Sequence, residues 1–141
     1  FCYYNNEEMT KAKFYKGWLY TGDVGTWDEN EFVTVSGRKD DMIVSAGENI
    51  YPTQIEAVLN EHPKVAESAV IGVPDKLRGE VVAAYVVPSD SSLTVDELKD
   101  YCTHHPMLSS YKWPRVYHIV DELPHTATGK LMHYKLREQH R

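Results

Sequence analysis

Residues 81–87 are apolar along nearly their whole length, and this run limits the possible folds more than any other feature of the chain. A strand with one face in solvent alternates apolar and polar residues, whereas a strand covered on both faces is apolar throughout. The run therefore predicts a central strand with structural layers on both sides. Such a strand is typical of a fold that combines a sheet with helices.

The neighbouring segments supply the other elements of that fold. Strands are expected at residues 68–73 and 116–120, and capping boxes are expected to open two helices. The capping pairs are Thr53 with Glu56 and Thr94 with Glu97, and a short last helix is expected at residues 131–138 with Leu131, Tyr134 and Lys135 on one face. We therefore expect an α+β domain in which helices pack on a three-stranded sheet.

Residues 1–39 have a different character. Residues 1–16 are polar and aromatic and present no core face, while residues 18–20 and 32–35 have the aromatic and β-branched content of short strands. Residues 28–31 are expected to form a turn, with Asn30 in a left-handed conformation. This part predicts a β-rich remnant that belongs to a preceding domain. Further on, residues 45–49 are expected to form a loop.

Composition narrows the function classes. The chain has 141 residues, enough for one domain or for a small domain plus part of another. A net charge of −6 argues against nucleic acid as a partner. No apolar run approaches about 18 residues, so no transmembrane segment is expected. The first residue is Phe, which favours a fragment of a longer protein.

Cysteine and histidine usage indicates neither a disulfide framework nor a metal site. Cys2 and Cys102 lack the spacing of a zinc site or a redox pair, which favours a reducing, cytoplasmic compartment. The seven histidines show no metal-ligand spacing, so no metal ligand is expected among them.

Two short segments before residue 41 could contact a nucleotide. At residues 20–23 a glycine allows close backbone approach, and the carboxylate of Asp23 can accept two hydrogen bonds from a vicinal diol. At residues 37–41, Arg38 could contact a phosphate or a ribose. Taken singly, each segment is more often an ordinary turn or a charged surface loop.

Two later segments are equally weak indications of a functional site when each is taken alone. Residues 47–52 lead into a helix and could be no more than its start. Lys130 follows Thr126, Ala127, Thr128 and Gly129, and an ammonium on such a loop can meet negative charge that develops on phosphate or carboxylate oxygens. A lysine after a glycine turn is more often solvent-exposed and inert.

Taken together, the segments closely resemble the adenylate-forming superfamily of acyl-CoA synthetases, peptide-synthetase adenylation domains and luciferase-like enzymes. The matching motifs are Trp-Leu-Tyr-Thr-Gly-Asp at 18–23, Gly-Arg-Lys-Asp-Asp-Met-Ile at 37–43, Gly-Glu-Asn-Ile-Tyr-Pro at 47–52 and Pro-His-Thr-Ala-Thr-Gly-Lys at 124–130. The resemblance runs from about Asn5 to Glu138. It implies that residues 1–39 end a large N-terminal domain and that residues 40–141 form the small mobile C-terminal domain.

The resemblance also implies roles in formation of an acyl adenylate. Asp23 would bind the ribose hydroxyls of ATP, and Arg38 would contact the same nucleotide. Asp40 would be the hinge of the C-terminal domain. Lys130 would bridge the carboxylate and α-phosphate oxygens as pyrophosphate leaves, which is electrostatic catalysis rather than base catalysis. Mg²⁺ would arrive with ATP and be held mainly by the missing domain.

A second pose is implied for thioester formation. Lys130 would swing away, and the loop of Gly47, Glu48 and Asn49 would replace it so that the pantetheine arm of CoA can pass. Arg78 stands where some relatives carry a Trp against CoA, and its cation could meet a CoA phosphate. A solvated surface charge is the competing interpretation.

The resulting hypothesis is an AMP-forming acid–thiol ligase of fatty acid metabolism, with a carboxylic acid, ATP and CoA as substrates and a fatty acid as the favoured acid. Two alternatives remain open. One is a peptide-synthetase adenylation domain that serves a carrier-protein thiol, and the other is a non-catalytic α+β binding module. In every case the chain is expected to be inactive without its own N-terminal domain.

Overall fold

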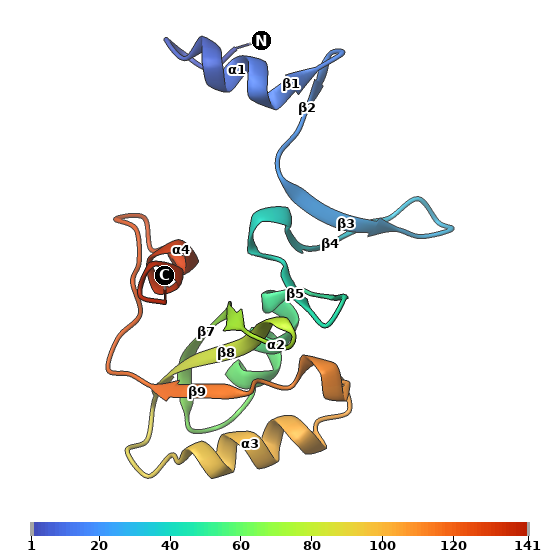
Figure 1. The fold of residues 1–141 in the computed structure, drawn as a ribbon. Helices are drawn as coiled ribbons and strands as arrows, with labels where there is room; N and C mark the ends of the chain where they lie inside the picture. The colour runs from blue at the N-terminus through green and yellow to red at the C-terminus, as the bar shows by residue number, and fades with distance from the viewer. Residues whose placement is uncertain (1, 141) are drawn as a thin grey trace. The chain divides into compact units, whose positions relative to one another are not determined.

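The computed structural model describes residues 2–140. Its internal contacts divide the chain into two compact units, of which one ends at Asp40 and the other begins at Asp41 (Figure 1). The sequence places this boundary between residues 39 and 40. Within the described residues, no helix is both long and apolar enough to cross a membrane.

The first unit begins with a short helix and a small hairpin. Helix α1 spans Glu7–Lys13, and its N-cap Asn6 accepts a hydrogen bond from the backbone of Met9. Strands β1 (Phe14–Tyr15) and β2 (Trp18–Leu19) follow and pair antiparallel. Helix α1 contains no buried residue, so capping rather than packing holds it.

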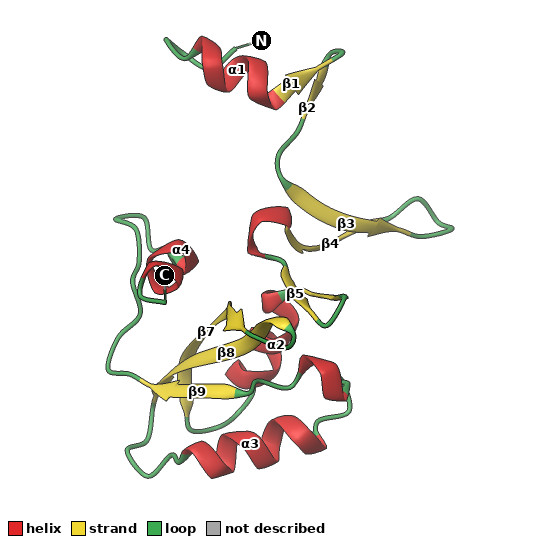
Figure 2. Cartoon of the chain, viewed as in Figure 1, coloured by secondary structure: helices red, strands yellow, loops and turns green. Residues whose placement is uncertain are grey.

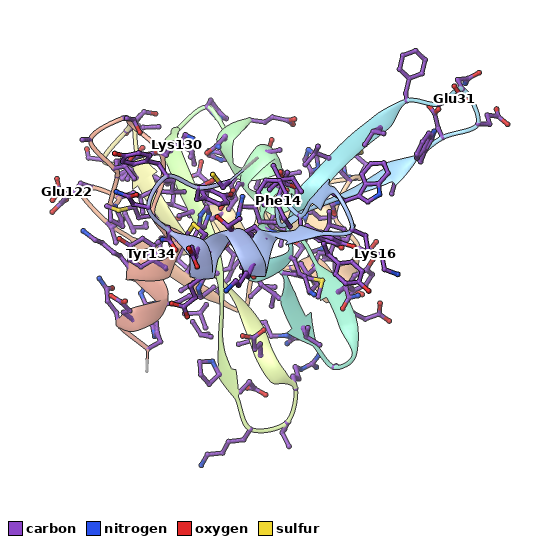
Figure 3. All side chains as sticks on the ribbon, turned by 90° about the horizontal axis from the view of Figure 1, so that it is seen from above. Phe14, Lys16, Glu31, Glu122, Lys130 and Tyr134 are labelled. Atoms are coloured by element: carbon purple, nitrogen blue, oxygen red, sulfur yellow. The ribbon has the colours of Figure 1, made fainter. Side chains whose placement is uncertain are left out.

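A second hairpin completes this unit. Strands β3 (Asp23–Trp27) and β4 (Val33–Arg38) pair antiparallel, and β3 was not expected from the sequence. Figure 3 shows Glu31 at the hairpin tip, and Glu31 rather than Asn30 is left-handed there, with φ of 66°. The Asp28 carboxylate accepts from the backbone N–H of Asn30 and Phe32, and these bonds fix the turn.

The second unit opens with another hairpin where a loop was expected. After the 3₁₀ turn η1 (Lys39–Asp41), strand β5 (Ile43–Ser45) pairs with β6 (Glu48–Ile50). Ala46 and Gly47 between them both have positive φ, 50° and 86°. Left-handed residues at both central positions define the type I′ turn that suits the twist of short hairpins.

Helix α2 (Pro52–Asn60) starts differently from the expectation. Pro52 takes a first-turn position and Tyr51 is the N-cap, with no side-chain capping bond. The expected capping box of Thr53 and Glu56 is therefore wrong, because Thr53 already lies within the helix and the Glu56 carboxylate accepts from the N–H of Val70 instead.

The remaining elements follow the sequence pattern more closely. Strands β7 (Val65–Asp75) and β8 (Gly79–Pro88) form a long hairpin, followed by helix α3 (Val95–His104), the 3₁₀ turn η2 (Ser110–Lys112), strand β9 (Val116–Ile119) and helix α4 (His133–Glu138). Thr94 caps α3 as expected and accepts from Glu97 N–H. In α4 the inward residue is Leu136, whereas Tyr134 and Lys135 are exposed, so the face expected for this helix is wrong.

The expected α+β class is confirmed, since the second unit combines helices with a sheet (Figure 2). That sheet has five strands rather than the expected three. Its order is β6-β5-β8-β7, and β9 runs parallel to β8. The three expected strands are β7, β8 and β9. The additional strands β5 and β6 span only Ile43–Ser45 and Glu48–Ile50, lengths at which a period of two is not recognisable.

Strand β8 is covered on both faces, as its apolar run predicts. Val82, Ala84 and Val86 join a core cluster with α2 and α3, while Val81, Ala83 and Tyr85 join a second cluster that includes Leu123 and Leu136. Successive side chains of a strand point to opposite faces, so one strand feeds both clusters. The unit is thus a sheet between two layers, with α2 and α3 on one face and α4 on the other.

Candidate active site

Asp23 and Arg38, which the sequence separates by a hairpin, are direct partners. They pair across the first rungs of β3 and β4, and the Arg38 guanidinium donates to Asp23 Oδ1 at 3.2 Å. Both side chains are about half exposed, at 42% and 50% for Asp23 and Arg38. A carboxylate held by one oxygen and open to solvent retains acceptor capacity for a hydroxyl of a ligand.

Gly22 shapes the pocket in front of this pair. Its φ of +87° is a left-handed value, and a Cβ there would lie 3.2 Å from Arg38 Nη2. A pocket of about 370 Å³ opens at this point, between the segment 19–24, the end of α1 and the residues Lys39 and Asp40. Asp23 lines this pocket, and its carboxylate together with the size of the pocket suits a polar ligand fragment such as a sugar.

The segment expected to act as a hinge is a single 3₁₀ turn. Lys39 donates its backbone N–H to Gly22 O at 2.8 Å, and the exposed Asp40 follows. Asp41, the next residue, accepts from Arg137 of α4 at 2.9 Å in a partly buried ion pair. Asp40 is therefore the point in the chain at which the contacts of one unit end and those of the other begin.

Gly47 and Arg78 lie in neighbouring turns. The N–H of Ala46 donates to Arg78 O at 2.9 Å, and Ser45 pairs with Gly79. A Cβ at Gly47 would meet no atom within 4 Å, so the tip of this turn is open. Tertiary structure thus brings two of the segments expected to contact CoA to the same end of the β7–β8 hairpin. Glu48 and Asn49 are exposed on β6 beside that turn.

Lys130 lies on a further hairpin, which is anchored to the β7 side of the sheet. His125 bridges Leu131, the N–H of Thr126 donates to Lys130 O at 2.8 Å, and Gly129 N–H donates to Thr126 O at 2.9 Å. Gly129 has φ of +81°, which gives the pattern of a three-residue loop closed by a left-handed glycine. The exposed Lys130 therefore sits on a structured loop rather than on a mobile tail (Figure 3).

Thr126 reinforces this loop through its side chain. Its hydroxyl oxygen accepts from Lys130 N–H at 3.0 Å and lies 2.9 Å from the Thr128 hydroxyl. These bonds give the two threonines that precede Gly129 a structural role, since each satisfies backbone or hydroxyl groups that a tight turn leaves without partners.

An ion pair anchors the start of the Lys130 hairpin. His125 Nε2 lies 2.6 Å from Glu67 Oε1 on β7, and Nδ1 lies 2.8 Å from Leu123 O. The hydrogen bond to Glu67 raises the pKa of His125 above its ordinary value, and the Glu67 charge adds to the effect.

A second ion pair anchors the end of the hairpin. His133, the first residue of α4, places Nε2 2.7 Å from Glu56 Oε1. The same carboxylate caps the N–H of Val70 on the edge strand β7. Burial lowers the pKa of His133, but the hydrogen bond and charge of Glu56, with Asp41, outweigh it, so the pKa is raised overall.

The Gly47 turn and the Lys130 hairpin lie at opposite limits of the sheet. The Gly47 turn joins β5 to β6, the outermost strand on one side, and the Lys130 hairpin is anchored to β7 on the other. Along the β7–β8 hairpin, Gly79 marks the Arg78 end, whereas Glu67 pairs with Val87 near the other end. The rise of a strand makes that separation about 25 Å.

No cluster of three or more His, Cys, Asp and Glu side chains suited to a metal ion occurs among residues 2–140. Ion pairs of single partners occur instead, among them Asp23 with Arg38 and Asp41 with Arg137.

The chain belongs to the AMP-binding enzyme C-terminal domain family, whose profile matches residues 54–130. It is 48% identical over 134 residues to a 2-succinylbenzoate–CoA ligase of Bacillus licheniformis, which covers 95% of this chain and 27% of that protein. It is 43% identical to a long-chain-fatty-acid–CoA ligase of Yersinia pestis, and the match covers 97% of this chain and 24% of that protein. The chain thus spans about a quarter of the length of these relatives.

Solved structures give the same result. An o-succinylbenzoate CoA synthetase of Bacillus subtilis, in complex with its acyl-adenylate intermediate, matches with a TM-score of 0.89 and 43% identity over 96% of this chain and 28% of that one. An anthranilate CoA ligase in complex with anthranoyl-AMP matches with a TM-score of 0.87 and 35% identity. This match covers 99% of this chain and 28% of that one. The expected membership of the adenylate-forming superfamily is confirmed.

The sequence missed the residues that support the Lys130 hairpin. His125 and His133 showed no metal-ligand spacing, and their partners Glu67 and Glu56 lie 58 and 77 positions away. No local pattern signals pairs of such separation. The only available indication was that each histidine lies within a few residues of Lys130.

Proposed function

We propose that this chain is the C-terminal part of an AMP-forming acid–thiol ligase that makes an acyl adenylate and then a CoA thioester. The observation that carries the proposal is the co-occurrence, in one member of this family, of the Asp23–Arg38 pair, the open Gly47 turn and the structured Lys130 hairpin. One group would serve the nucleotide, one the thiol and one the reacting carboxylate.

We propose an aryl acid, rather than the fatty acid favoured by the sequence, as the substrate. Support comes from the curated relatives that are 44–48% identical, because they are named 2-succinylbenzoate–CoA ligases, whereas the fatty-acid ligase is 43% identical. Two of the matching solved structures carry aryl adenylates in their names. The residues that would read the acid belong to a part of the protein outside this chain.

In the first half-reaction, the Asp23 carboxylate would accept hydrogen bonds from the ribose hydroxyls of ATP, with Arg38 holding it in place. Lys130 would reach the oxygens of the acid and of the α-phosphate, where negative charge concentrates as the carboxylate attacks and pyrophosphate leaves. A fixed ammonium stabilises that charge without moving a proton. Mg²⁺ would enter with ATP and neutralise the leaving pyrophosphate.

In the second half-reaction, the CoA thiolate would attack the adenylate carbonyl and expel AMP. The Gly47 turn offers an open backbone for the pantetheine arm to pass, with Glu48 and Asn49 beside it, and the Arg78 cation lies in the next turn, where it could meet a CoA phosphate. The separation of about 25 Å along the β7–β8 hairpin argues against simultaneous use of both ends in one site. Rotation about Asp40 would exchange them.

The proposal requires a partner domain, and residues 2–40 supply a reason to expect one. Trp18, Trp27 and Phe32 are largely exposed, although aromatic side chains of this size usually lie in a core or an interface. We propose that the protein's own large N-terminal domain covers them. The chain alone is then expected to be inactive.

A carrier-protein thiol in place of CoA is the remaining catalytic alternative. The relatives favour CoA, since the curated proteins named above are CoA ligases. A non-catalytic binding module would leave the open Gly47 turn and the threonine-braced lysine hairpin without a purpose.

The proposal is tested in the longer protein by pyrophosphate exchange into ATP across 2-succinylbenzoate, anthranilate and fatty acids of increasing length. Lys130→Ala should reduce exchange by about 10²–10³-fold, because one charge-stabilising group is removed. Thioester formation from a preformed adenylate should persist. Lys135→Ala, which removes an exposed lysine of α4, is the matched control and should leave both reactions unchanged.

Absence of exchange with every acid would contradict the ligase function. Exchange with fatty acids and not with aryl acids would leave the ligase standing and overturn the proposed substrate. Exchange that survives in Lys130→Ala would overturn the role of the lysine alone.

A further inference from the structure

The Lys130 hairpin is flanked by a histidine at each end, and each histidine contacts a carboxylate of the sheet–helix body. His125 lies on the first strand-like segment of the hairpin and reaches Glu67 of β7, and His133 follows the second segment and reaches Glu56 of α2. Between these contacts, the hairpin is held by its own backbone bonds.

The geometry of His125 specifies its protonation state. Leu123 O and Glu67 Oε1 can only accept hydrogen bonds, and they lie 2.8 and 2.6 Å from Nδ1 and Nε2. Both ring nitrogens must therefore carry a proton, which makes the ring an imidazolium. A neutral ring would direct a lone pair at one of the two acceptors.

His133 has a different environment. Glu56, Asp41 and Arg137 are the charged groups around it, from α2, η1 and its own helix. Its contact with Glu56 involves Nε2 alone, so a neutral ring protonated at Nε2 can still donate the 2.7 Å bond. The Glu56 carboxylate also caps Val70 N–H at 2.8 Å, which fixes its position from the strand side.

We propose that His125 and His133 are positioning residues for Lys130, which clamp the two ends of its hairpin to β7 and α2 so that the ammonium is delivered in one orientation. The proposal rests on the role of Lys130 in adenylate formation. A misplaced catalytic group loses rate steeply with distance, so a hairpin that must swing between two poses benefits from being rigid as a unit.

Both histidine–carboxylate ion pairs of the clamp depend on pH, because both pKa values are raised, but only at His125 does loss of the proton also remove a hydrogen bond. Since the pKa of His125 is raised in the folded protein, its imidazolium–carboxylate ion pair with Glu67 is fully present below the ordinary histidine pKa and is lost, together with one of the ring's two hydrogen bonds, as pH rises through the raised value. His133 can keep its bond in the neutral form. Raising the pH should therefore release the His125 end of the hairpin first.

A third histidine–carboxylate pair serves as a comparison within the same domain. His105 Nε2 lies 3.3 Å from Glu61, but its Nδ1 accepts from the N–H of Met107 at 3.3 Å. The neutral ring satisfies both partners there, because one nitrogen accepts and the other donates. This pair joins the C-terminal ends of α2 and α3, is not part of the Lys130 hairpin, and matches the clamps in composition.

The first arm of the test measures structure in the 141-residue chain. Imidazole titration by NMR should give His125 a pKa above its ordinary value, and Glu67→Gln should return it towards that value. Amide exchange at Gly129 and Lys130 should become about tenfold faster in Glu67→Gln, relative to other sheet amides. Glu61→Gln should change neither reading. Unchanged exchange and titration in Glu67→Gln would overturn the clamp, whatever the enzyme does.

The second arm measures the two half-reactions in the longer protein. Glu67→Gln should slow adenylate formation by about tenfold while thioester formation from a preformed adenylate is kept. His125→Arg supplies a cation that does not titrate in this range, and should retain adenylation at the high pH where the native protein loses it. Glu61→Gln should behave as the native protein does.

The two arms separate this inference from the function on which it rests. Absence of adenylation in the native protein contradicts the ligase proposal, but leaves the titration and exchange results to be judged by themselves. Equal losses in both half-reactions for Glu67→Gln would assign Glu67 a general structural role and overturn positioning, as would a high-pH loss that His125→Arg does not prevent.

Discussion

Trp18, Trp27 and Phe32 in the first unit are 75%, 72% and 69% exposed, whereas Leu59 and Leu98 in the second are fully buried. None of the hydrophobic side chains described at residues 2–40 is buried, and the two core clusters are confined to the part from Ile43 onward. Both units nevertheless contain a capped helix, antiparallel hairpins and left-handed glycines. The same local structural features thus occur in a unit with a hydrophobic core and in a unit without one.

The comparison shows that caps, tight turns and left-handed glycines define the local backbone shape, while burial of apolar side chains supplies most of the stability. A hairpin or a short helix is marginal in water unless it covers apolar surface. Residues 41–140 meet that requirement within the chain, since β8 feeds one cluster on each face of the sheet. Residues 2–40 expose the side chains with which they would meet it. Matched substitutions in the two units can test this contrast.

The largest contrast is expected from removing a leucine in each unit. Leu98→Ala should lower the free energy of unfolding by about 3 kcal/mol, because it leaves a cavity among α3, α2 and the sheet. Leu19→Ala, at a side chain 49% exposed, should change it by less than about 0.5 kcal/mol. Urea unfolding of the 141-residue chain, followed by circular dichroism, measures both. Similar losses would mean that residues 2–40 share the core of the second unit.

A smaller contrast is expected from two glycines of nearly equal geometry. Gly129 and Gly17 have φ of +81° and +83°, and a Cβ at either would meet nothing within 4 Å. Gly129→Ala should reduce the free energy of unfolding by about 1–2 kcal/mol, from left-handed strain alone. Gly17→Ala should leave the main transition unchanged, because the β1–β2 hairpin contributes no buried side chain to it. A shift of that transition in Gly17→Ala would break the comparison.

The smallest contrast concerns the two helix caps. Thr94 caps α3, which buries Leu98 and Cys102, and Asn6 caps α1, which buries nothing. Thr94→Ala should cost about 1 kcal/mol of unfolding free energy, whereas Asn6→Ala should only speed amide exchange at Met9. Hydrogen exchange of the chain reads both effects at once. Global destabilisation by Asn6→Ala would show that α1 is coupled to the core.

Some of the fold could be predicted because it depends on neighbours in sequence. The apolar run at residues 81–87 identified the buried strand β8, and Thr94 identified the start of α3. The predictions from sequence were wrong where the role of a residue depends on a partner far away in the sequence. Glu56 reads as half of a capping box, but Val70 and His133 engage its carboxylate. In α4 the side chain that enters the core is Leu136, set by contact with the sheet rather than by helical spacing.

The candidate site divides in the same way. The sequences of the four motifs identified Asp23, Arg38, Gly47 and Lys130 as candidate site residues, and their roles stay proposals. Their arrangement was not readable, because β3 was not recognised as a strand and the Asp23–Arg38 contact depends on its pairing with β4. Likewise, Arg78 joins Gly47 only through the bond from Ala46 N–H to Arg78 O.

The sequence by itself determined the family, the α+β class and the identity of the motif residues, because these depend on local composition and order. Tertiary structure decided which residues support them: Glu67 and Glu56 as anchors of the Lys130 hairpin, and Asp41 as the partner of Arg137. The physical reason is range. Backbone propensity acts over a few residues, whereas an ion pair forms between whichever charges the packed sheet brings within about 4 Å.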